Sequence, residues 1–208
     1  MGADTLVLYH WPQSRSATAR WALEEAGAPY ELKILNMSKG EHKTPELLAL
    51  NPLGKLPTLT HGDAVVTETA AIVAYLADTF PAARLAPPPG EKARGPYLRW
   101  LVMSVATLEP AIIDRAMKRE PGQAGMVPYG NFEGLMDVLA KSVSQGTWLL
   151  GERFTAADIV IASGLRWSMA FGIVPPRDEF TAYVGRVTTR PAIARAIALD
   201  AEIMAAAG

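Results

Sequence analysis

Hydrophobic and polar positions change their spacing along the chain and predict a first region of short strands and helices. Residues 5–10 form a short apolar run, which is the pattern of a buried strand. Residues 30–34 alternate apolar and polar positions, which is the pattern of a half-buried strand. Between these strands, residues 17–26 are predicted to form a helix that Ser16 caps and that ends at Gly27.

The next 45 residues predict a loop with a short helix, then a hairpin and a further helix. Residues 38–50 are the loop and the short helix, and residues 56–60 are a short strand. Gly62-Asp63 is a two-residue hairpin signal, after which Val65 to Thr67 forms the second strand and residues 69–78 form a helix. The predicted order is therefore βαβαββα.

Everything after a proline-rich boundary is predicted to be helical. Pro87-Pro88-Pro89-Gly90 cannot lie inside a helix, so we expect a domain at 1–80, a linker at 81–91 and an all-helical domain at 92–208. The expected helices cover residues 92–117, 132–145, 156–170, 178–188 and 191–206, with a kink at Pro110 and a loop at 119–131. Thr155 and Asp158 have the spacing of a capping box, a folding signal at the start of the third of these helices.

Composition removes several classes of function. The chain has 208 residues and no cysteine, which excludes disulfides, thiolate ligands and a cysteine nucleophile. A net charge of −1 gives no reason to expect binding to nucleic acid or an acidic membrane. No apolar run is long enough to span a membrane and no signal peptide is evident, so we expect a cytoplasmic protein. The three histidines form no metal-ligand pattern, and we expect no metal.

The stretch Asn51 to Leu59, with the helix start at Glu68-Thr69, predicts a binding site for a small peptide. Pro57 lies at the start of a strand, and a cis Leu56-Pro57 bond would leave the Leu56 N–H and C=O facing outward. These two groups could pair with an extended peptide as a further strand does. The helix start offers free N–H groups to a carboxylate, and Glu68 offers a carboxylate to an ammonium group.

These residues resemble the glutathione-binding site of the glutathione transferase family. The resemblance is carried by Asn51-Pro52-Leu53-Gly54-Lys55-Leu56-Pro57 and Glu68-Thr69, and it is supported by Leu8 to Glu25 and by Gly151 to Asp158. It implies a thioredoxin-like domain followed by a helical domain, with glutathione as co-substrate. It also implies a cytosolic homodimer that attaches glutathione to a small hydrophobic electrophile.

Thiolate formation requires a modest contribution from the protein. A free thiol has a pKa of roughly 8.5, and a pKa of about 6.5 requires roughly 2.7 kcal/mol of preferential stabilisation. One hydrogen bond to a charged acceptor contributes about 1.5–3 kcal/mol, so one hydroxyl at the start of the first helix is enough. Ser14 is the first candidate, because serine-type members carry their active hydroxyl two residues after a proline such as Pro12. Tyr9, Ser16 and Arg15 are the alternatives.

The resemblance also implies the other contacts of the two substrates. The glycine carboxylate would meet Lys43, more weakly His42, and Lys55, while the backbone at Leu56-Pro57 would pair with the cysteinyl unit. Glu68 and Thr69 would hold the γ-glutamyl end, with threonine in place of the family's usual serine. The candidates for the second-substrate site are His10, Trp11, Tyr97, Trp100, Met103, Thr107 and Tyr129.

Two other functions fit the same residues. The same site would support a glutathione-dependent peroxidase, disulfide reductase or isomerase, because these enzymes differ in the second substrate. A non-catalytic binding or scaffold protein on this fold is the third hypothesis. Such proteins often lack the active hydroxyl or the γ-glutamyl contacts, whereas Ser14, Glu68 and Thr69 are all present here.

Overall fold

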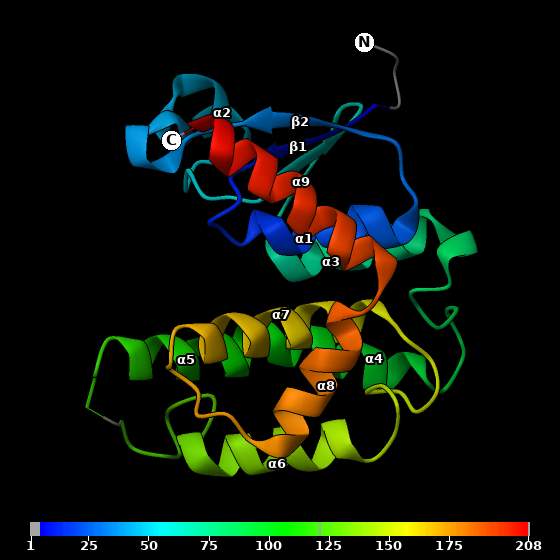
Figure 1. Cartoon of the computed structure of the whole chain (residues 1–208), viewed down its shortest axis with the longest axis vertical. Helices are drawn as coiled ribbons and strands as arrows, with labels where there is room; N and C mark the ends of the chain where they lie inside the picture. The colour runs from blue at the N-terminus through cyan, green and yellow to red at the C-terminus, as the bar shows by residue number, and fades with distance from the viewer. Residues whose placement is uncertain (1–4, 121, 208) are drawn as a thin grey trace. The chain divides into compact units, whose positions relative to one another are not determined.

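The computed structural model describes residues 5–120 and 122–207 and divides the chain into two compact units. Unit 1 extends to Ala83 and resumes at Pro191, and unit 2 is Arg84–Arg190. Each unit is described below by itself, with the element labels of Figure 1.

Unit 1 is a four-stranded mixed sheet with helices. Its regular elements are β1 (Leu6–His10), α1 (Ser16–Ala26), β2 (Tyr30–Ile34), α2 (Pro45–Leu50), β3 (Thr58–His61), β4 (Ala64–Thr67), α3 (Thr69–Thr79) and α9 (Pro191–Ala207), with short 3₁₀ turns at Met37–Lys39, Glu41–Lys43 and Pro81–Ala83. The strand order is β2-β1-β3-β4, in which β1 and β2 are parallel and the other two pairs are antiparallel. The βαβαββα order predicted for this region is confirmed.

The strand register brings three segments to one end of the sheet. Tyr9 pairs with Thr58, and Thr58 pairs with Thr67. The end of β1, the start of β3 and the end of β4 therefore lie at the same edge. Because α1 and α3 begin shortly after β1 and β4, their N-termini start from this edge too.

Two local predictions in unit 1 change. Ser16 is the first residue of α1 and not its N-cap; Arg15 takes the cap position and makes no side-chain cap bond. The Ser16 hydroxyl instead accepts a hydrogen bond from the Trp11 N–H (3.0 Å), which ties the preceding loop to the helix. Strand β3 begins at Thr58 because Pro57 forms a cis bond with Leu56 just before it. The helix end at Gly27 is confirmed, with φ of +61°.

The two units differ from the domains expected from the sequence, because helix α9 belongs to unit 1 and not to the helical unit. It packs against α1 in unit 1 and is not part of unit 2. Arg195 Nε donates to Glu24 Oε2 (3.0 Å), and Asp200 forms an ion pair with Arg20. The helical periodicity of residues 191–206 predicts the helix but does not indicate which core it covers.

Unit 2 is helical. Its elements are α4 (Arg94–Met103), the π-helical segment η4 (Ser104–Leu108), α5 (Glu109–Ala116), α6 (Phe132–Ser144), α7 (Ala156–Ala170) and α8 (Asp178–Thr188). The single helix expected over 92–117 is interrupted by η4, directly before Pro110. Proline has no N–H and its ring excludes the carbonyl four residues earlier, so the preceding turn widens.

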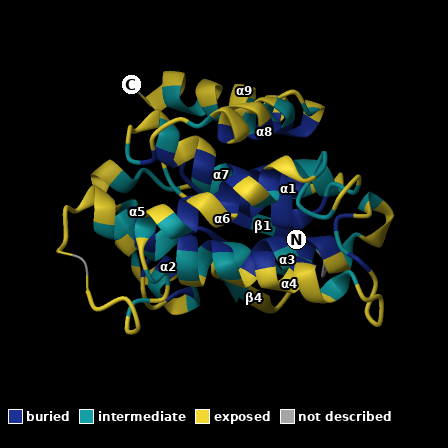
Figure 2. Ribbon diagram, turned by 90° about the horizontal axis from the view of Figure 1, so that it is seen from below, coloured by how far each residue is buried: buried dark blue, intermediate teal, exposed yellow. Residues whose placement is uncertain are grey.

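The capping box at the start of α7 is confirmed and lies in the core. The Thr155 N–H donates to Asp158 Oδ2 (2.9 Å), and Asp158 Oδ1 accepts from the Leu149 N–H (2.9 Å) and the Tyr183 hydroxyl (2.8 Å). Asp158 is fully buried, within the buried first half of α7 (Figure 2).

Within the described residues, no helix has both the length and the apolar character that a membrane span needs.

Candidate functional site

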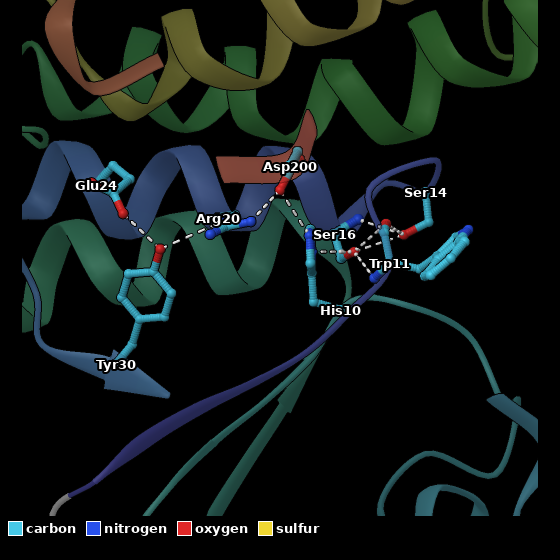
Figure 3. Close-up of polar contacts among 8 residues, drawn as sticks. All are labelled: His10, Trp11, Ser14, Ser16, Arg20, Glu24, Tyr30 and Asp200. Carbon is cyan, nitrogen blue, oxygen red and sulfur yellow. Dashed lines mark hydrogen bonds and ion pairs between the residues drawn. The ribbon is translucent and has the colours of Figure 1, made fainter. Parts of the chain in front are cut away.

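The loop between β1 and α1 is closed by its own serine side chains (Figure 3). The Ser14 N–H donates to the Trp11 carbonyl (3.1 Å), and the Ser14 hydroxyl lies 2.8 Å from the same oxygen. The Ser16 N–H donates to Ser14 Oγ (3.1 Å), and the two hydroxyl oxygens are 2.7 Å apart. These bonds fix Ser14 at the N-terminus of α1.

Of these two serines, Ser14 is the more exposed. Its side chain is partly exposed, whereas Ser16 is 0% exposed. A molecule arriving from solvent can meet the Ser14 hydroxyl but not the Ser16 hydroxyl. The backbone N–H groups of the first turn of α1 add a positive dipole end beside this hydroxyl.

Tyr9 lies on the other face of the sheet. Successive residues of a strand point to opposite faces, and the side chain of His10 faces α1 through Ser16. Tyr9 accordingly packs with Trp11, Leu47 and Leu56, and it is only 8% exposed. Its environment is that of a core aromatic residue, whereas Ser14 is partly exposed. Arg15 is exposed and takes the cap position of α1.

The turn before β3 presents an unpaired stretch of backbone. The Leu56-Pro57 bond is cis, and neither the N–H nor the C=O of Leu56 bonds to another described residue. The buried amide of Asn51 stabilises this turn by donating to the Lys55 carbonyl (3.0 Å) and to Thr58 Oγ1 (3.2 Å). Leu56 therefore offers the donor and acceptor that an extended peptide needs.

Glu68 stands in a strained backbone conformation at the start of α3. Its φ is +67°, which is unusual for a residue other than glycine, and its side chain makes no cap bond to the helix. Non-glycine residues in such conformations cluster at ligand-binding sites. The Glu68 side chain is exposed, and Thr69 follows it as the first helical residue.

His42 and Lys43 lie on the loop that faces the Gly54 turn, and Lys55 directly follows Gly54 in that turn. Lys43 Nζ donates to the Leu53 carbonyl (2.9 Å), and a Cβ at Gly54 would come within 2.8 Å of Lys43 Nζ. A side chain at this position would displace the Lys43 ammonium group, and the φ of +55° at Gly54 also favours glycine. Lys55 is exposed, while the buried His42 Nδ1 has no hydrogen-bond partner among the described residues.

The second-substrate candidates differ in burial. His10, Trp11, Tyr97 and Trp100 are buried, so each exposes little of its side chain. Met103, Thr107 and Tyr129 are partly exposed, and the Tyr129 hydroxyl donates to Asp114 Oδ2 (2.9 Å).

His10 belongs to a cluster of polar side chains next to this loop, whose other members the sequence pattern did not indicate. His10 Nε2 lies 2.9 Å from Asp200 Oδ1 on α9, and the Arg20 guanidinium pairs with the same oxygen. Arg20 Nε also donates to the Tyr30 hydroxyl (3.3 Å), which donates to Glu24 Oε1 (2.6 Å). The available signal was the position of Asp200 within the apolar helix of residues 191–206.

Comparison with known proteins gives the family. The model of the glutathione S-transferase N-terminal domain matches residues 4–78, and the model of the C-terminal domain matches residues 131–191. Glutathione S-transferase theta-2 of Homo sapiens is 30% identical over 176 residues, which are 77% of this chain and 71% of that protein. The chain belongs to the glutathione transferase family.

Solved structures of this family have the same fold. The ternary complex of BphK, a bacterial glutathione transferase, superposes with a TM-score of 0.80 at 27% identity and covers 94% of this chain and 99% of that one. A glutathione transferase homologue from Sulfitobacter with bound glutathione has a TM-score of 0.75 at 26% identity and covers 92% and 96%. The thioredoxin-like domain and the helical domain expected from the resemblance are therefore confirmed.

Proposed function

We propose that this transferase binds glutathione along the Leu56 edge and stabilises its thiolate with the hydroxyl of Ser14. The observation that supports this most directly is the accessible Ser14 hydroxyl at the N-terminus of α1. It lies at the same end of the sheet as the unpaired Leu56 backbone and the start of α3. A thiol between these groups would be next to one hydroxyl donor and one helix dipole.

The remaining proposed contacts follow the chemistry of the tripeptide. The cysteinyl unit pairs with the Leu56 N–H and C=O beside Pro57. The γ-glutamyl ammonium meets the Glu68 carboxylate, and its carboxylate meets Thr69 and the free N–H groups of α3. Lys43 and Lys55 supply positive charge for the glycine carboxylate, with His42 as a weaker partner. The substrate attacked by the thiolate is a small hydrophobic electrophile.

Ser14 contributes to thiolate formation by donating its hydrogen. Without glutathione, the Ser14 hydroxyl has the Trp11 carbonyl and Ser16 Oγ as acceptors. A thiolate is a charged acceptor and forms the stronger hydrogen bond, so the Ser14 hydrogen turns toward it. One bond to a charged group is worth about 1.5–3 kcal/mol, which corresponds to a fall of about 1–2 units in the thiol pKa.

Replacing Ser14 by alanine tests this function. We expect Ser14→Ala to raise the pKa of bound glutathione by about 1–2 units, as followed by the ultraviolet absorbance of the thiolate, while glutathione still binds. The matched control is Ser142→Ala, which removes an exposed hydroxyl that bonds within α6. An unchanged thiol pKa in Ser14→Ala would remove Ser14 from this role, and no binding of glutathione at millimolar concentration would refute the proposed function.

A further inference from the structure

A chain of hydrogen-bonding groups leads from Ser14 into the interior of unit 1 (Figure 3). Ser14 Oγ lies 2.7 Å from Ser16 Oγ, and Ser16 Oγ lies 2.8 Å from His10 Nδ1. Each distance is shorter than that from the same hydroxyl to the Trp11 carbonyl, which is 2.8 Å for Ser14 and 3.0 Å for Ser16. The opposite ring nitrogen of His10 lies 2.9 Å from Asp200 Oδ1.

Asp200 determines which ring nitrogen of His10 carries the hydrogen. The Arg20 guanidinium can only donate, and it pairs with the same Asp200 oxygen, so this oxygen is an acceptor. His10 therefore donates from Nε2, and Nδ1 of the neutral ring accepts. The single hydrogen of the Ser16 hydroxyl then points to His10, while its oxygen accepts from the Trp11 N–H and can accept from Ser14.

Building on the proposed function, in which Ser14 meets the glutathione thiol, we infer that Ser14, Ser16 and His10 relay the thiol proton to the His10 ring. The S–H bond breaks as its proton passes to Ser14 Oγ. The hydrogen of Ser14 passes to Ser16 Oγ, and the hydrogen of Ser16 passes to His10 Nδ1. The products are a thiolate that accepts from the Ser14 hydroxyl and an imidazolium that pairs with Asp200, so no proton is gained or lost.

Burial shields this path from solvent, and Asp200 lies beside the group that would receive the proton. Ser16 and His10 are both 0% exposed, so water does not compete for their hydrogen bonds. The imidazolium that forms already has a carboxylate 2.9 Å from its other nitrogen, and its charge is opposite to that of the new thiolate. Arg20 is held in place by Tyr30 and Glu24, which keeps Asp200 beside the ring in both charge states. His10 and Asp200 would thus act on the thiol through the two serines.

The test compares two quantities on the wild-type chain at one pH near neutrality. Thiolate formed per bound glutathione is measured by its ultraviolet absorbance, and protons released to the buffer are measured by titration calorimetry in two buffers of different ionisation enthalpy. The relay predicts more thiolate than released protons. The difference should appear as imidazolium at His10 in ¹⁵N NMR spectra, which are simple because the chain has 3 histidines.

Variants at His10 separate the relay from a structural role. The Gln amide in His10→Gln can still donate to Asp200, and the Asn oxygen in His10→Asn can still accept from Ser16, but neither side chain takes up a proton. In both variants the difference between thiolate and released protons should fall to zero. The control is His61→Gln, because His61 bonds to Tyr75 (2.7 Å) and is not part of the hydrogen-bonded relay. This variant should keep the wild-type difference between thiolate and released protons.

The outcomes distinguish the relay from the proposed function. Equal amounts of thiolate and released protons in the wild type would overturn the relay while leaving thiolate stabilisation by Ser14 intact. A difference that persists in His10→Gln or His10→Asn would also overturn it. Binding of glutathione without thiolate formation would instead overturn the proposed function, and the relay with it.

Discussion

Asp158 at the start of α7 should be among the most costly residues to truncate. Its carboxylate accepts from two backbone N–H groups, those of Leu149 and Thr155, and from the Tyr183 hydroxyl. In Asp158→Ala these three donors, of which the Thr155 N–H and the Tyr183 hydroxyl are buried, lose their partner, and each unsatisfied buried donor costs about 1–3 kcal/mol. We therefore expect the free energy of unfolding to fall by about 3 kcal/mol or more.

A second variant, Asp158→Asn, tests how much of this stability depends on the charge of the carboxylate. Burial raises the pKa of Asp158, and the N–H groups of Leu149 and Thr155 and the Tyr183 hydroxyl oppose that effect. A neutral side chain with one acceptor oxygen avoids the cost of burying charge but leaves one backbone N–H facing an NH₂ group. Asp158→Asn should therefore lose stability, but less than Asp158→Ala does.

Urea and thermal unfolding of the full chain, followed by circular dichroism, would check both values. A loss of about 3 kcal/mol corresponds to a fall of about 6–12 °C in Tm for a chain of this size. The matched control is Asp137→Ala, because Asp137 is 72% exposed and pairs with Arg177 on the surface. That variant should lose less than about 1 kcal/mol. A loss of the same small size in Asp158→Ala would refute the assignment of Asp158 as the buried acceptor of this cap.

Two further predictions concern strained Glu68 and the half-buried phenol of Tyr30 in unit 1. Glu68→Gly relieves a φ of +67°, so it should stabilise the chain by about 1 kcal/mol or more. The same change removes the proposed ammonium contact and should weaken glutathione binding about tenfold or more by calorimetry; gain of stability with unchanged affinity would exclude that contact. Burial, together with the hydrogen bond to Glu24, raises the pKa of Tyr30 to about 12, so the stability from its protonated form should be lost as pH rises from about 10 to about 12. Subtracting the tyrosinate titration of Tyr30→Phe from that of the wild type should give this midpoint, and a midpoint near the ordinary value would contradict the burial of the phenol.

The parts of the fold that depend on local chemistry could be predicted from the sequence. Period-two alternation gave β2 with its observed bounds, and the capping box gave the start of α7. The Gly62-Asp63 signal predicted the hairpin, and Pro57 marked the strand start at which the structure has a cis bond. Each of these features is decided by residues within a few positions of one another, which is the range that spacing and turn chemistry report.

The choice between Ser14 and Tyr9 could not be made from the spacing of residues that are close in the sequence. Tyr9 lies at the end of β1 and Ser14 lies in the loop that follows, and from the sequence the choice between them depends on a one-residue alignment choice. The structure distinguishes them by the face of the sheet: Tyr9 packs into the cluster with Leu47 and Leu56, and the next residue, His10, points to the opposite face. The environment of these side chains depends on packing against α2 and α1, which the strand pattern alone does not specify.

Asp200 shows why the inner part of the site escaped prediction. It lies 190 residues from His10 in the sequence, and no spacing rule connects a residue of the last helix with the end of the first strand. The helical pattern of residues 191–206 was detected, but an acidic residue on an apolar helix is interpretable only once the facing surface is known. Here that surface contains Arg20 and His10, two buried polar groups that need an acceptor. A buried polar residue is costly unless it is paired, so these three side chains constrain one another, and through Ser16 they reach the one serine of the loop that is open to solvent. The sequence therefore indicates the outer part of the proposed site, whereas the inner part, which would determine where a thiol proton goes, depends on the packing of α9 against α1.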